Sequence, residues 1–249
     1  MTPYSAQLVF KADVPLDIKS VFYIPAMNSE RFGMRQLPPG VHLYCRRVLI
    51  QRNAPDLLPS YLSWISGVVD SEDLPLSISR ESMQDQRKMA NLKSVVTKRI
   101  IKWLTDEAKR VPDDYKDFYG QFGYKIKEGV ASDRLNAASL AALLRYPSSA
   151  TTDTEPAALE QYVARMPEGQ DTIYYLVAED RRVAEASPYY EAFKRAGLEV
   201  LFCYHEHDEV VLGNLGQFRD TPLKSIEEVP PARPPPLSPA CPQFKAWTG

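Results

Sequence analysis

The sequence predicts an α/β chain in which two α/β units are joined by helices and followed by a proline-rich segment. Three observations carry this prediction. Short β-type runs precede a long amphipathic helix, a strand–helix–strand pattern begins again after Thr151, and seven of the 21 prolines fall within residues 229–249. We expect a large α/β unit at 1–111, a helical connector at 112–150, a smaller α/β unit at 151–228, and a disordered tail or linker at 229–249.

Composition and charge narrow the class of protein. The 249 residues are 44% hydrophobic and 25% charged, which is the profile of an ordinary globular protein. A net charge of −2 gives no overall attraction to nucleic acid or to a membrane surface. No apolar run approaches the roughly 18 residues of a membrane helix, and MTPYSAQLVF lacks a signal-peptide pattern. Three widely spaced cysteines favour a reducing compartment over a disulfide framework, so we do not expect secretion.

The first unit begins with three β-type runs, Gln7–Lys11, Ser20–Ile24 and Val41–Gln51, which we expect to form an antiparallel or mixed sheet. The polar connection from Pro25 to Gly40 carries three large apolar residues, Met27, Phe32 and Met34. Either these side chains form an adaptable surface that contacts other proteins, or they pack back onto the sheet.

The next stretch runs from a loop into the longest helix. Asp56–Ile65 is predicted to be a short helix, and Gly67–Ser79 a loop with Ser79 as the helix N-cap. Spacings of three and four residues define one apolar face of the long helix, formed by Met89, Leu92, Val96, Ile100 and Trp103. The opposite face is basic, with Arg87, Lys88, Lys93, Lys98, Arg99 and Lys102.

Arg80 stands at the point where the loop becomes this helix. Gln84 follows four positions later, so both side chains point the same way. A guanidinium beside an amide at a helix N-terminus suits the binding of an oxyanion such as phosphate. The spacing fits equally a surface arginine that pairs with Glu81 or Asp85, and it does not decide between the two.

Helices and then a second α/β pattern follow. Asp113–Lys127 and Asp133–Arg145 are predicted helices, in which Tyr115, Phe118, Tyr119, Phe122 and Tyr124 serve as packing residues. After Thr154 as a cap, the predicted elements are a helix at 155–166, a strand at 173–178, a helix at 184–196 that ends at Gly197, and a strand at 199–204. The short return between the two strands predicts that they are parallel.

Other chemical motifs are weak. No phosphate-binding glycine loop and no nucleophile elbow occurs in the sequence. Cys203, His205 and His207 resemble metal ligands but lack a fourth partner, so we expect no metal. The carboxylates of Asp70, Glu72 and Asp73 are interpreted as a solvated capping loop rather than as an acid–base pair.

Several long stretches resemble the middle segment of the heat-shock protein 90 chaperones. They are GVVDSEDLPL with the following Ser-Arg-Glu, LLRYPSSA, YVARMPEGQDTIYYL, SPYYEAF and EVLFCYHEHDE, and the resemblance covers residues 7 to 228. The 25–40 connection is short and lacks the lysine-rich insertion of cytosolic members. The mitochondrial and bacterial branches lack this insertion too, and the chain resembles the mitochondrial branch most, also called tumour-necrosis-factor-receptor-associated proteins. Ser77 departs from the family, which usually has Asn at that position.

The resemblance implies two α/β sandwich subdomains within a longer ATP-dependent chaperone. Arg80 and Gln84 would reach the γ-phosphate of ATP, with its Mg²⁺, bound in an N-terminal domain of the same protein. The isolated chain would hold no cofactor and would not be an enzyme by itself. Client proteins and a homodimer formed through a C-terminal domain would be the partners, in the mitochondrion or, alternatively, the cytoplasm.

Two other functions stay open from the residues. The chain could be a non-catalytic protein-binding module that acts through the 25–40 loop and the proline-rich tail. It could also bind nucleic acid along the basic helix face, although we expect no nucleic-acid or membrane partner.

Overall fold

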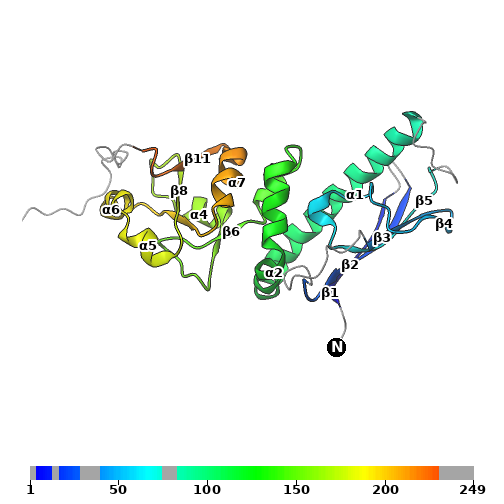
Figure 1. The fold of residues 1–249 in the computed structure, drawn as a ribbon, viewed down its shortest axis with the longest axis horizontal. Coiled ribbons are helices and arrows are strands. Elements are labelled where there is room, and N and C mark those ends of the chain that lie inside the picture. The colour runs from blue at the N-terminus through cyan, green and yellow to red at the C-terminus, as the bar shows by residue number, and fades with distance from the viewer. Residues whose placement is uncertain (1–3, 13–16, 29–39, 75–82, 230–249) are drawn as a thin grey trace, which may run out of the picture. The chain divides into compact units, whose positions relative to one another are not determined.

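The computed structural model describes residues 4–12, 17–28, 40–74 and 83–229, which form two compact units, Met1–Gly129 and Val130–Gly249 (Figure 1). Helices and several sheets alternate along the chain, so the predicted α/β class is confirmed. The finer partition into four segments stays a prediction. Residues 230–249, the core of the predicted tail, lie outside the described residues.

The first unit contains a mixed sheet of five strands in the order β1-β2-β5-β3-β4. Only the β3–β5 pairing is parallel, and the other three pairings are antiparallel. The strands are β1 (Tyr4–Ala12), β2 (Ile18–Pro25), β3 (Gly40–Cys45), β4 (Val48–Gln51) and β5 (Ser66–Ser71). Alternate residues of β2 are buried, because one face of the sheet packs on a helix and the other faces solvent.

Two predictions about these strands are wrong. The run Val41–Gln51 is not one strand, because Arg46 and Arg47 have φ of 49° and 66° and turn the chain into an antiparallel hairpin. The start of the predicted Gly67–Ser79 loop is β5, the central strand of the sheet. The acidic residues after Val69 hid the strand pattern from sequence analysis. Strand β5 pairs with β2 on one side and with β3 on the other.

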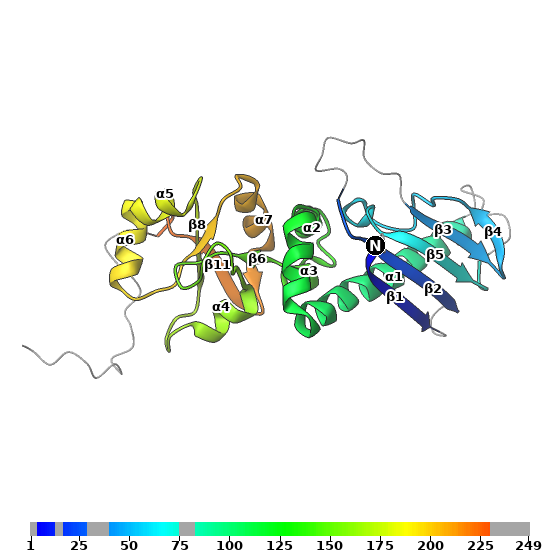
Figure 2. The ribbon, with the colours of Figure 1, turned by 90° about the horizontal axis from the view of Figure 1, so that it is seen from below.

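Two long helices complete the first unit. Helix α1 (Met83–Arg110) buries Leu92, Val96 and Ile100 on its predicted apolar face, and the guanidinium of Arg99 lies 5.5 Å from the ring centre of Phe10 on β1. The ribbon shows α1 running along one face of the sheet (Figure 2). Helix α2 (Pro112–Ser132) begins at the proline that ends the previous pattern. The helix predicted over Asp56–Ile65 is wrong, since only a 3₁₀ turn, η2 (Ser60–Leu62), forms there.

The second unit has a four-stranded sheet in the order β10-β11-β8-β9. Strand β8 (Ile173–Val177) is parallel to both β9 (Leu201–Cys203) and β11 (Thr221–Ser225), so the predicted parallel pair is confirmed. The remaining elements are β6 (Arg145–Tyr146), β7 (Ala157–Ala158), β10 (Gln217–Phe218), α3 (Ala137–Ala141), α4 (Leu159–Arg165), α5 (Arg181–Ala186), α6 (Pro188–Arg195) and α7 (His207–Leu215).

The helices of this unit are shorter than predicted. Only α3 forms within 133–145, and α4 begins at Leu159, so Thr154 caps no helix. The helix predicted over 184–196 is divided at Ser187, because Pro188 cannot continue the preceding helix and opens α6 instead. Gly197, with φ of 69°, follows the end of α6 as predicted.

Each unit has its own apolar core. In the second unit, Ala184 of α5 and Phe193 of α6 pack with Phe202 of β9 and their neighbours. In the first unit, Trp64 stacks with Phe118 and Phe122 of α2, which confirms α2 as a packing helix. The prediction for Tyr124 is wrong, because its side chain is exposed.

Candidate functional site at the junction of β5 and α1

The candidate site is the junction where the chain leaves β5 and enters α1. Arg80, the central residue of the prediction, lies outside the described residues, as do Phe32 and Met34. The structure does describe both ends of the intervening segment, residues 75–82.

Strand β5 fixes the first end. It pairs with β2 on one side and β3 on the other, and Val69 and Ser71 are fully buried. Gly67 permits the close pairing with β2, because a Cβ at that position would lie 2.2 Å from the carbonyl oxygen of Val21. The chain therefore leaves the sheet from its most constrained strand.

The three carboxylates that follow are held by partners within the first unit. The amide of Arg47 donates to Asp70 Oδ2 at 3.1 Å, and the amide of Asp17 donates to Asp73 Oδ2 at 2.7 Å. Lys19 Nζ donates to Glu72 Oε1 at 3.1 Å, and this bond, with the nearby charges of Asp17 and Glu72, raises the pKa of Lys19. Capping and pairing, rather than acid–base chemistry, account for these residues.

Two further contacts tie the end of this segment to the fold. The thiol of Cys45 donates to the carbonyl oxygen of Leu74 at 3.0 Å, and both residues are buried. Lys88 Nζ donates to the carbonyl oxygen of Asp73 at 3.1 Å, which connects α1 directly to the residues after β5. Both contacts hold residues 73 and 74, just before the 75–82 segment, and the second also joins them to α1.

Gln84 lies in the first described turn of α1 and is exposed. Lys88 follows four residues later and therefore lies on the same side of the helix. The sequence analysis placed Lys88 on the basic face of the helix but did not predict that it holds the residues after β5 in position. The spacing of four residues from Gln84 is the sequence feature that could have pointed to it. The described end of α1 thus offers an exposed amide donor beside a lysine that is bound to the carbonyl oxygen of Asp73, and donors of this kind suit an oxyanion.

Met27 is the described member of the predicted contact surface, and 64% of its side chain is exposed. Its neighbour Asn28 is buried and bound to α2. The amide of Asn28 donates to Gln121 Oε1 at 2.9 Å, and Gln121 Nε2 donates to the carbonyl oxygen of Ala26 at 3.0 Å. No local sequence pattern predicts this attachment, because the partners are more than 90 residues apart.

Within the described ranges, no group of three or more His, Cys, Asp or Glu side chains is arranged to hold a metal ion. Cys203 ends β9 and is buried, whereas His207 begins α7. A search of the described helices likewise finds none long and apolar enough to cross a membrane.

The family model described as Hsp90 protein matches residues 3–229, and the chain belongs to this family. The resemblance identified from the sequence is confirmed.

The relatives include mitochondrial and bacterial proteins. The TNF receptor-associated protein 1 homolog, mitochondrial, of Dictyostelium discoideum is 43% identical over 90% of this chain and 32% of its own length. The mitochondrial heat shock protein 75 kDa of Rattus norvegicus is 42% identical over 88% of the chain and 32% of its own length. The chaperone protein HtpG of Desulfitobacterium hafniense is 40% identical over 88% and 36%. The chain spans about a third of the length of these relatives.

Proposed function

We propose that this chain is the middle segment of an ATP-dependent molecular chaperone and completes an ATPase site together with a nucleotide-binding domain of the same protein. The observation that carries the proposal is the family match over residues 3–229. Relatives named as chaperone and heat shock proteins support it. Two mitochondrial relatives support a mitochondrial location, with the cytoplasm as the alternative.

In this proposal Arg80 is the charged donor to the γ-phosphate of ATP, and Gln84 is a second, neutral donor. The contacts of Cys45 and Lys88 support it, because they hold the residues just before the segment that contains Arg80 and join them to α1. Phosphoryl transfer depends chiefly on positioning and on stabilisation of charge, so a held arginine can make a large contribution. ATP and its Mg²⁺ would be held by the nucleotide-binding domain, and the isolated chain would neither bind nor hydrolyse ATP.

The same protein would bind clients and would dimerise through a C-terminal domain. Met27 supports a client-contact role for the 25–40 connection, because a mostly exposed methionine adapts to apolar partners of different shape. Phe32 and Met34 would extend that surface.

The test joins this chain to its nucleotide-binding domain and measures steady-state ATP turnover. Arg80→Ala should lower kcat by about 10²-fold or more, the scale of a lost charge-stabilising donor. Arg80→Lys should restore only part of this rate, because an ammonium lacks the planar fork of the guanidinium. Gln84→Ala should cost less than Arg80→Ala, since a neutral donor stabilises charge less.

The matched control is Arg87→Ala, which removes an exposed arginine from the same helix and should leave turnover within about twofold. ATP affinity should change little in all variants, because adenine and the inner phosphates would be held elsewhere. Unchanged turnover in Arg80→Ala would assign Arg80 to a surface ion pair. Equal losses in Arg80→Ala and Arg87→Ala would indicate a general effect of helix charge instead.

A further inference from the structure

A pocket of about 400 Å³ lies in the first unit, where the ends of β1 and β2 meet the corner between α1 and α2. Its size falls in the range of sites that hold small ligands or inserted side chains. Ile24 of β2 and Leu104 of α1 line it together with three aromatic residues of α2, Tyr115, Phe118 and Phe122. The pocket is separate from the junction of β5 and α1.

Contacts of the backbone and side chains hold the walls of this pocket in place. Phe118 stacks on Phe122 with ring centres 5.3 Å apart, and Tyr115 lies 5.5 Å from Phe118. The bond from Gln121 Nε2 to the carbonyl oxygen of Ala26 joins the strand wall to the helix wall, because both residues line the pocket. A pocket formed before its ligand arrives avoids much of the entropy cost of ordering.

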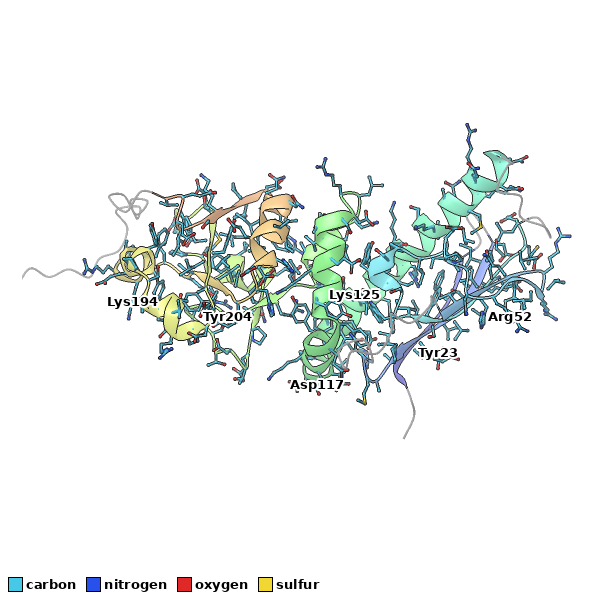
Figure 3. The ribbon with its side chains drawn as sticks, in the orientation of Figure 1. Tyr23, Arg52, Asp117, Lys125, Lys194 and Tyr204 are labelled. Carbon is cyan, nitrogen blue, oxygen red and sulfur yellow. The ribbon has the colours of Figure 1, made fainter. Side chains whose placement is uncertain are left out.

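The charge of the pocket is negative. Four charged residues line it, namely Glu107, Arg110, Asp114 and Asp117. Arg110 is already bound to Glu107 through two hydrogen bonds, of 3.1 Å from Nε and 2.5 Å from Nη2. Asp114 and Asp117 are exposed, and the pKa of Arg110 is raised chiefly by its bond to Glu107 and also by the charge of Asp114. Asp117, and in part Asp114, can therefore meet an incoming cation; Figure 3 labels Asp117 on α2.

We propose that this pocket binds the arginine side chain of a polypeptide partner, with apolar residues of the partner on either side of that arginine. A guanidinium stacks on an aromatic ring and addresses carboxylates with its planar fork, so it matches both Phe118, the partly exposed ring of the lining, and the carboxylates; Tyr115 and Phe122 are buried beneath. A lysine would satisfy the charge but would stack less well on Phe118 and its neighbours. The proposal does not depend on the ATPase role, because neither Arg80 nor nucleotide takes part.

The test titrates the 249-residue chain with acetyl-Leu-Arg-Leu-amide at low salt and follows backbone amide signals by NMR. Signals of Gln7, Ala26 and Asp117 should shift with a saturable dependence on peptide. Replacement of arginine by citrulline, which has nearly the same shape but no charge, should weaken binding by about tenfold. Replacement by lysine should weaken it by about threefold, and 0.5 M salt should weaken the arginine peptide as well.

Matched variants locate the site. Asp114→Asn with Asp117→Asn should weaken binding by about tenfold, whereas Asp113→Asn should change it less than twofold. Asp113 is exposed in the same turn of α2 but does not line the pocket. Ala26→Phe should block the pocket without removing a charge, because only the backbone oxygen of Ala26 is used in the fold. The NMR spectrum of each variant reports whether it folds.

Three results would overturn the proposal. They are the absence of saturable shifts at millimolar peptide, equal binding of the arginine and citrulline peptides, and equal losses in the Asp113 and Asp114/Asp117 variants. Equal or tighter binding of the lysine peptide would overturn the choice of arginine. None of these results bears on Arg80, so failure here and failure of the proposed ATPase role are distinguishable.

Discussion

The two units use their polar side chains in different ways. In the first unit, carboxylates hold turns at the ends of the sheet, while exposed donors and charges remain on α1 and at the pocket beside α2. In the second unit, charged side chains cross-link segments that are distant in the sequence and leave the sheet enclosed. The comparison contrasts exposed donors and charges in the first unit with polar side chains in the second unit that hold distant segments together.

Glu199 is the centre of one cross-link in the second unit. Its carboxylate accepts two hydrogen bonds from Arg165, of 2.9 Å and 2.6 Å, and one of 2.5 Å from Ser148 Oγ. Its backbone oxygen accepts from the hydroxyl of Tyr162 at 2.6 Å. Two segments of the chain, Ser148 and α4, thus converge on one residue just before β9.

Arg181 is the centre of a second cross-link. It donates to Asp153 and Glu185, each at 3.0 Å, and to the carbonyl oxygens of Ser148 and Thr151. Its guanidinium lies 5.2 Å from the ring centre of Phe202 on β9. Residues 148–153 are therefore held by side chains of α5 as well as by Glu199.

The largest effect that tests this comparison is expected for Glu199→Ala. Only 10% of the Glu199 side chain is exposed, so its removal leaves Arg165 and Ser148 without their partner. We expect a loss of about 3 kcal/mol in the free energy of unfolding, the scale for breaking a largely buried ion pair. Urea denaturation measures the loss, and hydrogen exchange should place it within residues 130–229.

Glu168→Ala is the control for this variant, because Glu168 is exposed in the same unit and should cost less than about 0.5 kcal/mol. An effect of Glu199→Ala no larger than the control would show that the polar network adds little. Distant segments of the second unit would then be held together by the apolar core alone.

A smaller loss, confined to the first unit, is expected for Gly67→Ala. The new Cβ would lie 2.2 Å from the carbonyl oxygen of Val21 and 3.0 Å from Cα of Phe22, so β5 must move away from β2. We expect a cost of about 2 kcal/mol, the range for overpacking. Hydrogen exchange of β2 and β5 should rise while β8 and β9 keep their protection.

Gly120→Ala provides the opposite control in the same unit. A Cβ there meets no atom within 4 Å, and the residue lies in α2, so alanine should stabilise by about 0.5 kcal/mol. Destabilisation of equal size by both substitutions would mean that the close approach at Gly67 is not the cause.

Sequence periodicity predicted the elements with strong patterns and missed those fixed by distant partners. The face of α1 containing Leu92, Val96 and Ile100 was predicted because its spacing is helical. The parallel pair β8 and β9 was predicted because buried strands are continuous apolar runs. Strand β5 was missed because acidic residues follow it, and its status as a strand depends on pairing with β2 and β3.

The candidate site likewise combines residues that the sequence predicted with contacts that it did not predict. Residue chemistry and family resemblance brought attention to Arg80 and Gln84, but the roles of both stay predictions. Lys88 and Cys45 hold the residues just before the 75–82 segment through contacts that span 15 and 29 residues. Such contacts carry no local pattern. The acidic and aromatic pocket beside α2 was not predicted from the sequence either. Its aromatic residues were interpreted as packing residues, and the pocket forms only where the end of β2 meets them.

The smallest of the expected effects concerns the pH dependence of the second unit. Burial first, and then the hydrogen bond and charge of Asp153, raise the pKa of Tyr204, which Figure 3 labels. Burial also raises the pKa of Tyr162, Tyr174 and Tyr175. A tyrosine with a higher pKa in the folded state contributes stability that is complete below its unfolded pKa of about 10. That contribution is lost as the pH rises through the folded value.

We therefore expect the free energy of unfolding to fall as the pH rises above about 10. Tyr204→Phe should cost about 1 kcal/mol at pH 7, because the 2.6 Å bond to Asp153 is lost, and it should also make the alkaline decline shallower. Urea denaturation at pH 7, 9 and 10.5 measures both effects.

Tyr189→Phe is the control, since this exposed tyrosine lies in the same unit and its loss should leave the decline unchanged. An unchanged decline in Tyr204→Phe would remove Tyr204 from the alkaline dependence. An equal loss in the free energy of unfolding at pH 7 in both variants would mean that the bond to Asp153 does not help hold residues 148–153. The stabilising role of the polar network would then rest on Glu199 and Arg181.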